Sequence, residues 1–311
     1  MKELKIAIVQ HKPVHNHLSS SLEKAISYIV EASEAGAKLI VFGETWLCGY
    51  PAWIDYCPEI AQWNNETVKE AFMQLHNNSA AVNGKEIAAI CAIAMQHKVV
   101  ICIGFNEKII DGPGSGTIYN SFVFINEEGV IVNHHRKLVP TFNEKLLYGQ
   151  GDAAGLKTID TQWGKMGGLI CWEHWMPLSR QALHNEAELI HIALWPSVNE
   201  MHQIAARHYA FEGRCYVIAA AQIMQVKDIP SILTLPEYLK NDPEKYILNG
   251  GSCIIDPRGE FIVQPQFDKQ EILYCTIENT DAALKEKLTL DTSGHYNRSD
   301  IFDFSFNNKR K

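Results

Sequence analysis

The chain has 311 residues, of which 46% are hydrophobic and 21% are charged, and its formal net charge is −8 at pH 7. This is the composition of a folded globular protein and excludes a disordered or low-complexity chain. The acidic balance argues against a nucleic-acid surface or an acidic-lipid surface, so we expect neither nucleic acid nor membrane as a partner.

The N-terminal residues and the cysteines indicate the expected compartment. The start of the chain carries an acidic residue, Glu3, and lacks the basic start, apolar stretch and cleavage site of a signal peptide. The apolar stretches at residues 87–95 and 99–105 are interrupted by polar residues, whereas a membrane span needs about 20 mostly apolar residues. Eight cysteines are scattered along the chain, several of them in apolar segments. We therefore expect reduced thiols in a cytoplasmic protein.

Strands and helices alternate in the first third of the chain. Apolar runs predict strands at residues 4–9, 39–42 and 99–105, and helical spacing predicts helices at residues 18–35 and 68–97, the second with a break near residues 83–84. In the first helix, Leu22, Ala25 and Ile29 share one face. The serines at residues 19–21 offer N-terminal caps, and Gly36 offers a stop. This succession predicts a sheet that is covered by helices.

Two similar β-hairpins are predicted further along the chain. Residues 121–136 and 252–264 each read as two apolar strands around a polar turn that ends in glycine. Between the hairpins the pattern predicts strands at residues 166–171, 189–194 and 217–222, a helix from Pro177 and a helix at residues 200–214. Because no linker rich in Pro, Gly or Ser divides the chain, we expect one α/β domain with internal pseudo-symmetry over residues 1–304. A short, solvated, basic tail is expected over residues 305–311.

Three reactive side chains directly follow apolar strands. Glu44 follows residues 39–43, Lys137 follows residues 130–136, and Cys171 follows residues 167–170. Ligands gather at the carboxyl ends of strands in open α/β sheets, so these side chains are candidates for one site. Because the thiolate is the reactive form of cysteine, it needs a base or a cation nearby. Glu44 can take the proton, and Lys137 can stabilise charge on a tetrahedral intermediate.

Cys171 is the candidate nucleophile. The proline at position 177 suits the first turn of the next helix, so the thiol is predicted at a sharp strand-to-helix turn. Backbone N–H groups at such a turn can face a developing anion. The other seven cysteines are interpreted as small buried hydrophobic residues.

The thirteen histidines raise the alternative of a metal site. His11, His15 and His17 cluster in one segment, and His134 and His135 are adjacent. Adjacent residues on a strand point to opposite faces, so they make poor joint ligands. No pair has convincing zinc spacing with a third ligand, and we expect no metal.

At these residues the sequence resembles the nitrilase branch of the nitrilase superfamily of carbon–nitrogen hydrolases, over most of the chain. The family's catalytic glutamate, lysine and cysteine match Glu44, Lys137 and Cys171. A second family glutamate, which positions the substrate or shuttles protons, matches Glu144. The resemblance implies an α/β fold of the αββα four-layer sandwich type, with two mixed sheets packed between helices. It also implies no cofactor, and a homo-oligomer that is a dimer or a larger spiral.

The residues after the cysteine favour the nitrilase branch. Trp172, Glu173 and His174 resemble those of true nitrilases and cyanide-degrading relatives more than those of amidases. The implied reaction is hydrolysis of an organic nitrile by water to a carboxylic acid and ammonia, through a thioimidate and a thioester on Cys171. An amidase of the same superfamily, a cyanide-hydrolysing enzyme and an inactive binding protein are the alternatives. Glu173 and Glu212 either line the site or form structural salt bridges.

Four aromatic residues and one histidine near these motifs are candidates for substrate binding. They are Tyr50, Trp53, Trp172, His174 and Trp195. An aromatic-lined pocket would suit an aryl or arylalkyl nitrile. The alternative is that these side chains serve packing and subunit contact.

Overall fold

The computed structural model describes residues 2–310, so Met1 and Lys311, which end the expected domain and tail, lie outside the described residues. The first sheet contains β1 (Leu4–Gln10), β2 (Leu39–Phe42), β3 (Val100–Lys108), β4 (Ile118–Ile125), β5 (Ile131–Arg136) and β13 (Glu271–Ile277), in the order β13-β1-β2-β3-β4-β5. The second contains β6 (Ile159–Thr161), β7 (Gly164–Ile170), β8 (Ile190–Leu194), β9 (Tyr216–Ala220), β10 (Ile223–Gln225) and β11 (Tyr246–Ile255), in the order β10-β11-β9-β8-β7-β6, and β12 (Phe261–Phe267) pairs with β11.

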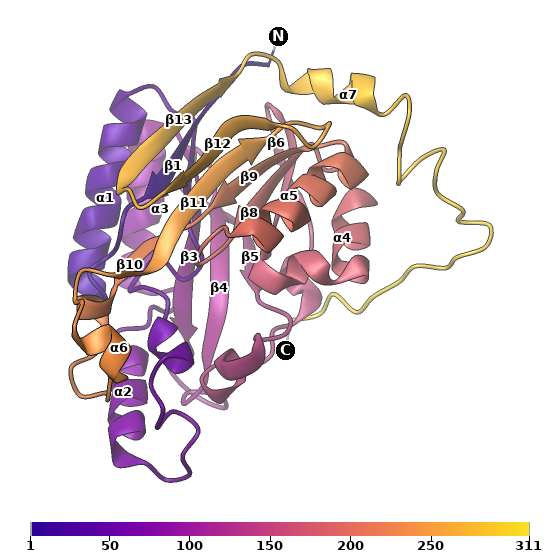
Figure 1. The fold of residues 1–311 in the computed structure, drawn as a ribbon. Helices are drawn as coiled ribbons and strands as arrows, with labels where there is room; N and C mark the ends of the chain where they lie inside the picture. Colours follow the sequence, from indigo (N-terminus) through magenta and orange to yellow (C-terminus); the bar gives the residue numbers. More distant parts are fainter. Residues whose placement is uncertain (1, 311) are drawn as a thin grey trace.

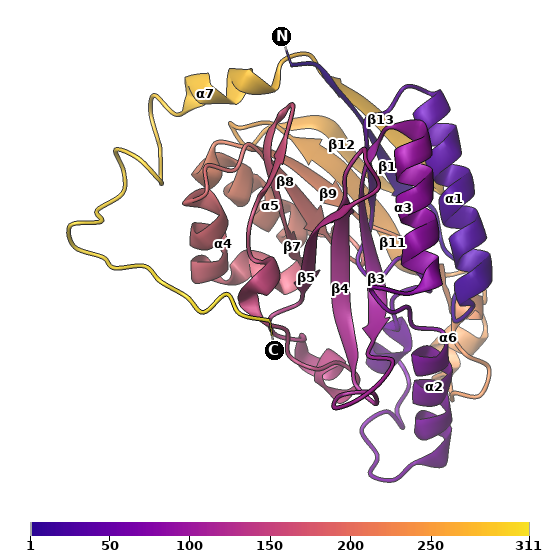
Figure 2. The same cartoon turned by 180° about the vertical axis from the view of Figure 1, so that it is seen from behind.

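The described residues form seven α-helices. They are α1 (Leu18–Glu34), α2 (Glu66–Asn77), α3 (Lys85–His97), α4 (Pro177–His184), α5 (Glu200–Gly213), α6 (Glu237–Lys240) and α7 (Ala283–Glu286). Helices α1 and α3 lie on the first sheet, and α4 and α5 lie on the second (Figure 1 and, from behind, Figure 2). The resulting order of helices, sheet, sheet and helices confirms the predicted αββα sandwich.

Both sheets are mixed and repeat one plan. Strands β1, β2 and β3 are parallel, and so are β7, β8 and β9. An antiparallel hairpin continues each set. In the first sheet β4 pairs with β3 and forms a hairpin with β5, and in the second sheet β11 pairs with β9 and forms a hairpin with β12. This repetition is the pseudo-symmetry that the two similar hairpins suggest. Parallel strands end on the same edge of their sheet, which brings the loops after them together.

One contact between the sheets lies close to the predicted site. The ring of Phe122, on β4, faces Gly168, on β7, and a Cβ atom on Gly168 would lie 3.2 Å from Cζ of Phe122. Both residues belong to the region where the large apolar core joins the sheets. Removing a buried aromatic side chain from such a core typically costs about 3–5 kcal/mol. The missing side chain of Gly168 therefore sets how closely the sheets approach here.

The sequence-based expectation of a serine cap at the start of α1 is wrong. The N-cap of α1 is His17 and not a serine, because Nδ1 of His17 accepts the backbone N–H of Ser20 at 3.3 Å. The hydroxyl of Ser21 instead turns inward and donates to the carbonyl of Val14 at 2.8 Å. A serine hydroxyl that already has a buried partner is not available to cap the helix.

Residues 305–310 of the basic tail are exposed, and Arg310 contacts the rest of the chain. Arg310 forms an ion pair with the buried carboxylate of Asp152, with 3.1 Å between the nitrogen and the oxygen. The guanidinium also donates to the backbone carbonyl of His134. The end of the chain thus returns to the edge strand β5. Between residues 2 and 310, no helix is both long and apolar enough to cross a bilayer.

Candidate active site

The loops after β2, β5 and β7 bring a carboxylate, an ammonium group and a thiol to one buried site. Nζ of Lys137 lies 2.8 Å from Oε1 of Glu44. Glu44 lies in the loop that follows β2 of the first sheet. The same ammonium donates to both oxygens of Glu144, at 2.8 and 2.9 Å. Cys171, which follows β7 of the second sheet, lies near enough for its thiol to interact electrostatically with all three. All four side chains are buried. We call Glu44, Lys137, Glu144 and Cys171 the quartet.

Lys137 is the electrostatic centre of the quartet. Burial alone lowers the pKa of Lys137, but interactions with the ionised forms of Cys171, Glu44 and Glu144 outweigh burial and hold the pKa well above its ordinary value. The ammonium is therefore charged at neutral pH. Because it faces two carboxylates, it can also stabilise new negative charge that forms next to the sulfur.

Glu44 is held so that one carboxylate oxygen stays free. Oε1 accepts hydrogen bonds from Lys137 and from Nδ2 of Asn120, the latter at 2.7 Å. Oε2 has no hydrogen-bond partner among residues 2–310. The side chain of Gln222 donates to the backbone carbonyl of Glu44. Burial raises the pKa of Glu44 to about 7, the nearby charge of Glu144 adds to this rise, and Lys137 opposes it. A carboxylate with this pKa is a suitable general base near neutral pH.

The loop that carries Glu44 packs tightly on β3. A Cβ atom on Gly104 would lie 2.4 Å from the carbonyl oxygen of Gly43 and 2.6 Å from the backbone nitrogen of Thr45. Thr45 itself has a φ of 47°, in the left-handed region. Glycine at position 104 therefore permits the turn that presents Glu44.

Glu144 lies in the short 3₁₀ helix Phe142–Leu146 and has three kinds of donor. Besides Lys137, its carboxylate accepts the backbone N–H of Thr141 at 2.8 Å and the hydroxyl of Tyr50 at 2.8 Å. Tyr50 is thus brought into the site as a partner of Glu144. These bonds fix the carboxylate of Glu144 beside the ammonium group of Lys137.

Cys171 has a strained backbone. Its φ is 51°, in the left-handed region that costs a residue with a side chain about 1–2 kcal/mol. It begins a 3₁₀ helix, Cys171–Trp175, that leads to Pro177 and α4. The turn predicted between strand and helix is therefore present, with a 3₁₀ turn interposed.

Glu173 holds this turn against the loop of Lys137. Its buried carboxylate accepts the backbone N–H of Ile170 at 2.7 Å and that of Leu138 at 2.8 Å, and both oxygens lie 3.0 Å from Nε2 of His135. Ile170 precedes the cysteine, and Leu138 follows the lysine. Of the two interpretations of Glu173, the structure favours a structural link between the sheets. Glu212 likewise pairs with Arg180, at 2.7 Å.

The thiol is not ionised on its own. Burial and the negative charge of Glu44 raise the pKa of Cys171 well above its ordinary value, although Lys137 acts in the opposite direction. The nucleophile must therefore lose its proton during attack, and Glu44 has a free oxygen to accept it. A thiol, a base, a fixed cation and a strained turn suit attack on an electrophilic carbon.

Comparison with known proteins identifies the family. The model of the carbon–nitrogen hydrolase family matches residues 5–285. The chain belongs to the carbon–nitrogen hydrolases. It is thus a hydrolase that acts on carbon–nitrogen bonds, as the resemblance implied.

Relatives of this carbon–nitrogen hydrolase include named nitrilases. An aliphatic nitrilase of Sinorhizobium fredii is 34% identical over 97% of this chain and 95% of its own length. Nitrilase 2 of Arabidopsis thaliana is 33% identical over 99% of this chain and 90% of its own length. Among solved structures, a carbon–nitrogen hydrolase from Helicobacter pylori G27 is similar in fold, with a TM-score of 0.74 at 21% identity, covering 96% of this chain and 97% of that chain.

The candidates for substrate binding lie in different surroundings in this carbon–nitrogen hydrolase. Trp53 packs in an apolar cluster and is 2% exposed. His174 is buried, and its Nδ1 lies 2.6 Å from the backbone carbonyl oxygen of Cys171. Trp195 is also buried, and its ring stacks on His174 with 4.6 Å between centroids. Trp172, in contrast, is 53% exposed.

Asn120 and Gln222 contact Glu44 or its backbone, but the sequence analysis does not name either as a site residue. The available signal is their position, because Asn120 directly precedes the hairpin predicted from residue 121 and Gln222 ends the strand predicted at residues 217–222. The structure brings no group of three His, Cys, Asp or Glu side chains into a metal-binding arrangement between residues 2 and 310.

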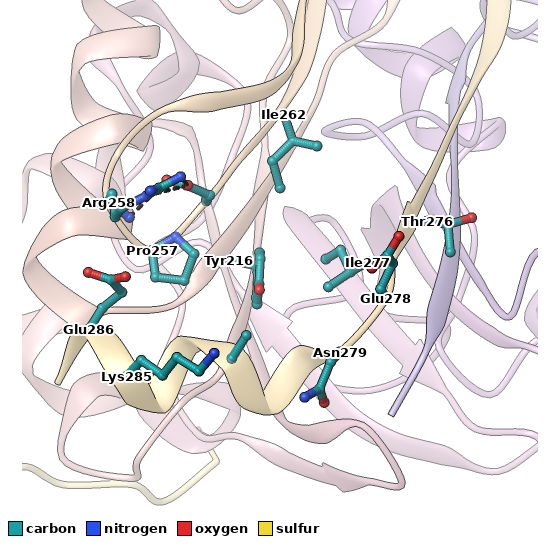
Figure 3. A pocket seen from close by; sticks show the side chains of 12 residues that line it. Tyr216, Pro257, Arg258, Ile262, Thr276, Ile277, Glu278, Asn279, Lys285 and Glu286 are labelled. Carbon is teal, nitrogen blue, oxygen red and sulfur yellow. Dashed lines mark hydrogen bonds and ion pairs between the residues drawn. The ribbon is translucent and has the colours of Figure 1, made fainter. Parts of the chain in front are cut away.

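A cavity of about 460 Å³ lies elsewhere on the molecule. Its lining includes Tyr216, Arg258, Asn279 and Lys285, from β9, the β11–β12 turn and the α7 region (Figure 3). No member of the quartet lines it. This cavity therefore lies apart from the quartet of this carbon–nitrogen hydrolase.

Proposed function

We propose that this carbon–nitrogen hydrolase is a nitrilase, which converts an organic nitrile and water to a carboxylic acid and ammonia. The observation that carries the proposal is the buried ammonium of Lys137, held between Glu44 and Glu144 beside Cys171. The nitrilase names of relatives at 33–34% identity support the nitrile as substrate.

The proposed reaction uses each member of the quartet. Sγ of Cys171 attacks the nitrile carbon while Glu44 takes the thiol proton, and Glu44 then passes this proton to the nitrile nitrogen, which gives a thioimidate and restores the carboxylate. Glu44 then activates a water that adds to the same carbon, and the nitrogen leaves as ammonia. A second water cleaves the resulting thioester, which releases the carboxylic acid and restores the thiol. Lys137 stabilises the tetrahedral intermediates, and Glu144 positions Lys137. General acid–base catalysis of this kind contributes about 10²–10⁴-fold.

The exposed aromatic residue next to the nucleophile is our candidate for contact with the organic group of the nitrile. Trp172 is half exposed, and its ring meets that of Trp175 edge to face at 5.3 Å. Tyr50, Trp53, His174 and Trp195 are buried, so we propose that they shape the site by packing or through other residues.

Product analysis tests the function. Purified protein is incubated with aliphatic, aryl and arylaceto nitriles, with the matching amides and with cyanide, and ammonia and carboxylic acid are quantified. We expect equal amounts of acid and ammonia from at least one class of organic nitrile. Turnover of amides without nitriles would indicate an amidase, and turnover of cyanide alone would indicate a cyanide-hydrolysing enzyme. Either result would overturn the proposal.

The pH dependence of the reaction follows from Glu44. Because burial raises the pKa of Glu44 to about 7, the carboxylate is largely ionised above this pH and takes up a proton below it. We expect kcat/KM to be maximal above pH 7 and to fall about tenfold for each pH unit well below it. Initial rates measured at each pH over a range of concentrations of one nitrile give kcat/KM and check this prediction. A flat profile through neutral pH would exclude Glu44 as the base.

We also propose that the protein forms a homo-oligomer through its α4–α5 face. On α5, Met201, Ile204 and Phe211 recur at helical spacing and are 46–58% exposed, and Leu178 of the adjacent α4 is 70% exposed. Exposed apolar side chains that gather on one face mark interaction surfaces. Light scattering after size exclusion is expected to give a mass of two or more chains, and Ile204→Lys is expected to lower that mass. A monomeric mass for the unaltered protein would contradict this proposal.

A further inference from the structure

A chain of four buried polar side chains leads away from the backbone of Cys171. Nδ1 of His174 lies 2.6 Å from the carbonyl oxygen of Cys171, and Nε2 of His174 lies 2.9 Å from Nε2 of His191. Nδ1 of His191 lies 2.9 Å from Oε1 of Glu188, and the hydroxyl of Tyr209 donates to Oε2 of Glu188 at 2.6 Å. These four side chains are at most 2% exposed. We call them the buried His–His–Glu–Tyr chain.

The positions of the protons follow from what each atom can do. A carbonyl oxygen only accepts, so Nδ1 of His174 carries hydrogen. A neutral imidazole has one N–H, so Nε2 of His174 accepts and Nε2 of His191 donates. Nδ1 of His191 must then accept, and its partner is a carboxyl oxygen of Glu188. This last bond exists only if Glu188 is protonated.

The electrostatic surroundings agree with an uncharged chain. Burial lowers the pKa of both His174 and His191 well below the ordinary value, and nearby histidines add to this effect. Burial raises the pKa of Glu188 to about 8; Tyr209 and the charge of His184 oppose the rise, and the charge of Glu186 adds to it. The three groups are therefore neutral together at pH 7. An imidazolium with a carboxylate would place two charges in the same buried space at a large desolvation cost.

The carbonyl that His174 holds belongs to the strained turn of the nucleophile. In a planar trans peptide the C=O and the following N–H point in opposite directions. Fixing the carbonyl of Cys171 thus fixes the N–H of Trp172. That N–H stabilises the thiolate and therefore lowers the pKa of Cys171, whereas burial raises it. The backbone of Cys171, with a φ of 51°, needs such a constraint because the conformation is unfavourable by itself.

We propose that Glu188, in its protonated form, with His191 and Tyr209, positions the nucleophile. These residues hold His174 in the tautomer that donates to the carbonyl of Cys171, and thereby direct the N–H of Trp172 toward the reacting atoms. They are positioning residues, since none of them reaches the substrate. The inference rests on the proposed function for its kinetic readout, but the positions of the protons do not depend on it.

Substitution of Glu188 by glutamine or leucine tests the proposal. In Glu188→Gln the amide nitrogen donates to Nδ1 of His191 and the amide oxygen accepts from Tyr209, so kcat is expected to stay within about threefold of the unaltered enzyme. In Glu188→Leu the donor is lost and His191 can reverse its tautomer. There kcat is expected to fall roughly 10- to 100-fold, with KM nearly unchanged, because the nucleophile is misplaced. A tenfold or greater loss in Glu188→Gln would overturn the proposal, even if the leucine variant does not fold.

A matched control is the other carboxyl group packed in this region. Glu212 pairs with Arg180 and lies 3.3 Å from Nε2 of His184, which hold its pKa down at about 2 against the effect of burial. Glu212 is therefore ionised, and Glu212→Gln is expected to lower the midpoint temperature of unfolding because it removes a paired charge. Glu188→Gln is expected to leave this temperature unchanged because Glu188 is already neutral. Equal thermal losses in the two glutamine variants would indicate an ionised Glu188 and overturn the proposal.

Two readouts need no nitrile. The ¹⁵N NMR spectrum of histidine-labelled protein, assigned with His174 and His191 variants, is expected to show hydrogen on Nδ1 of His174 and on Nε2 of His191 at pH 7. An imidazolium or the reverse tautomers would overturn the proposal. Alkylation of Cys171 by iodoacetamide is expected to slow in Glu188→Leu but not in Glu188→Gln. If no nitrile is hydrolysed, the proposed function fails while these two measurements still decide the role of Glu188.

Discussion

Replacement of Cys171 by alanine is expected to lower kcat by at least about 10⁴-fold while the fold persists. In the proposed reaction the sulfur of Cys171 forms the covalent intermediates, and the quartet contains no other thiol or hydroxyl group. Alanine keeps the left-handed turn and the hydrogen bond from His174 to the backbone carbonyl, because neither uses the sulfur. Ammonia release at saturating nitrile, with urea unfolding of the same samples, measures both effects.

The control for this variant is Cys253→Ala. Cys253 is buried in β11, and burial raises its pKa to about 12, so it is an unreactive thiol in the second sheet. The same atom is removed, but activity per folded molecule is expected to be unchanged. Retention of more than about one per cent of kcat in Cys171→Ala would contradict the assignment of the nucleophile, because catalysis without it is limited to weaker contributions.

Replacement of Lys137 by methionine is expected to reduce both catalysis and stability. The ammonium is 1% exposed and is bound by two buried carboxylates, so its removal leaves Glu44 and Glu144 without their shared cation. Removing one partner from a buried charge network typically costs about 3–5 kcal/mol in the free energy of unfolding. Loss of a donor that stabilises the intermediate lowers kcat by roughly 10²–10³-fold. Urea unfolding and steady-state kinetics measure these changes.

The matched control is an exposed ion pair. Lys227 binds Glu244 at the surface, where both side chains are more than 40% exposed. Exposed pairs contribute little because water screens them, so Lys227→Met is expected to leave unfolding and turnover unchanged. If Lys137→Met unfolded at the same urea concentration as Lys227→Met and kept full activity, the quartet would not be the catalytic centre.

Local pattern in the sequence points to three members of the quartet, whereas Glu144, in a 3₁₀ helix, was expected only from the family resemblance. Glu44, Lys137 and Cys171 each follow an apolar run that forms a strand, and strand ends share an edge of a sheet. The helices at 18–34 and 200–213 have clear spacing and were predicted within a residue or two. The short strands β6 and β10, of three residues each, carry too few side chains to show a period.

Contacts between segments far apart in the sequence are what the sequence did not predict. Asn120 on β4 donates to Glu44, which follows β2 of the same sheet 76 residues earlier. Glu173, which follows β7 of the second sheet, accepts the N–H of Leu138, which follows β5 of the first sheet, 35 residues earlier. These contacts depend on how strands are ordered in a sheet and on how the two sheets are stacked, which no local period encodes. His17 shows a related limit at short range, because its ring caps α1 while Ser21, one of the expected caps, donates to the carbonyl of Val14.

The contact between Phe122 and Gly168 has a consequence for the evolution of the enzyme. Phe122 lies two residues after Asn120, which binds Glu44, and Gly168 lies three residues before Cys171. The contact between Phe122 and Gly168 therefore sets the distance between β4 and β7, close to Glu44 and Cys171. A larger residue at 168 would push the strands apart unless the residue at 122 became smaller. Natural variation at these two positions should therefore be correlated, and the tolerated pairs should conserve their combined volume.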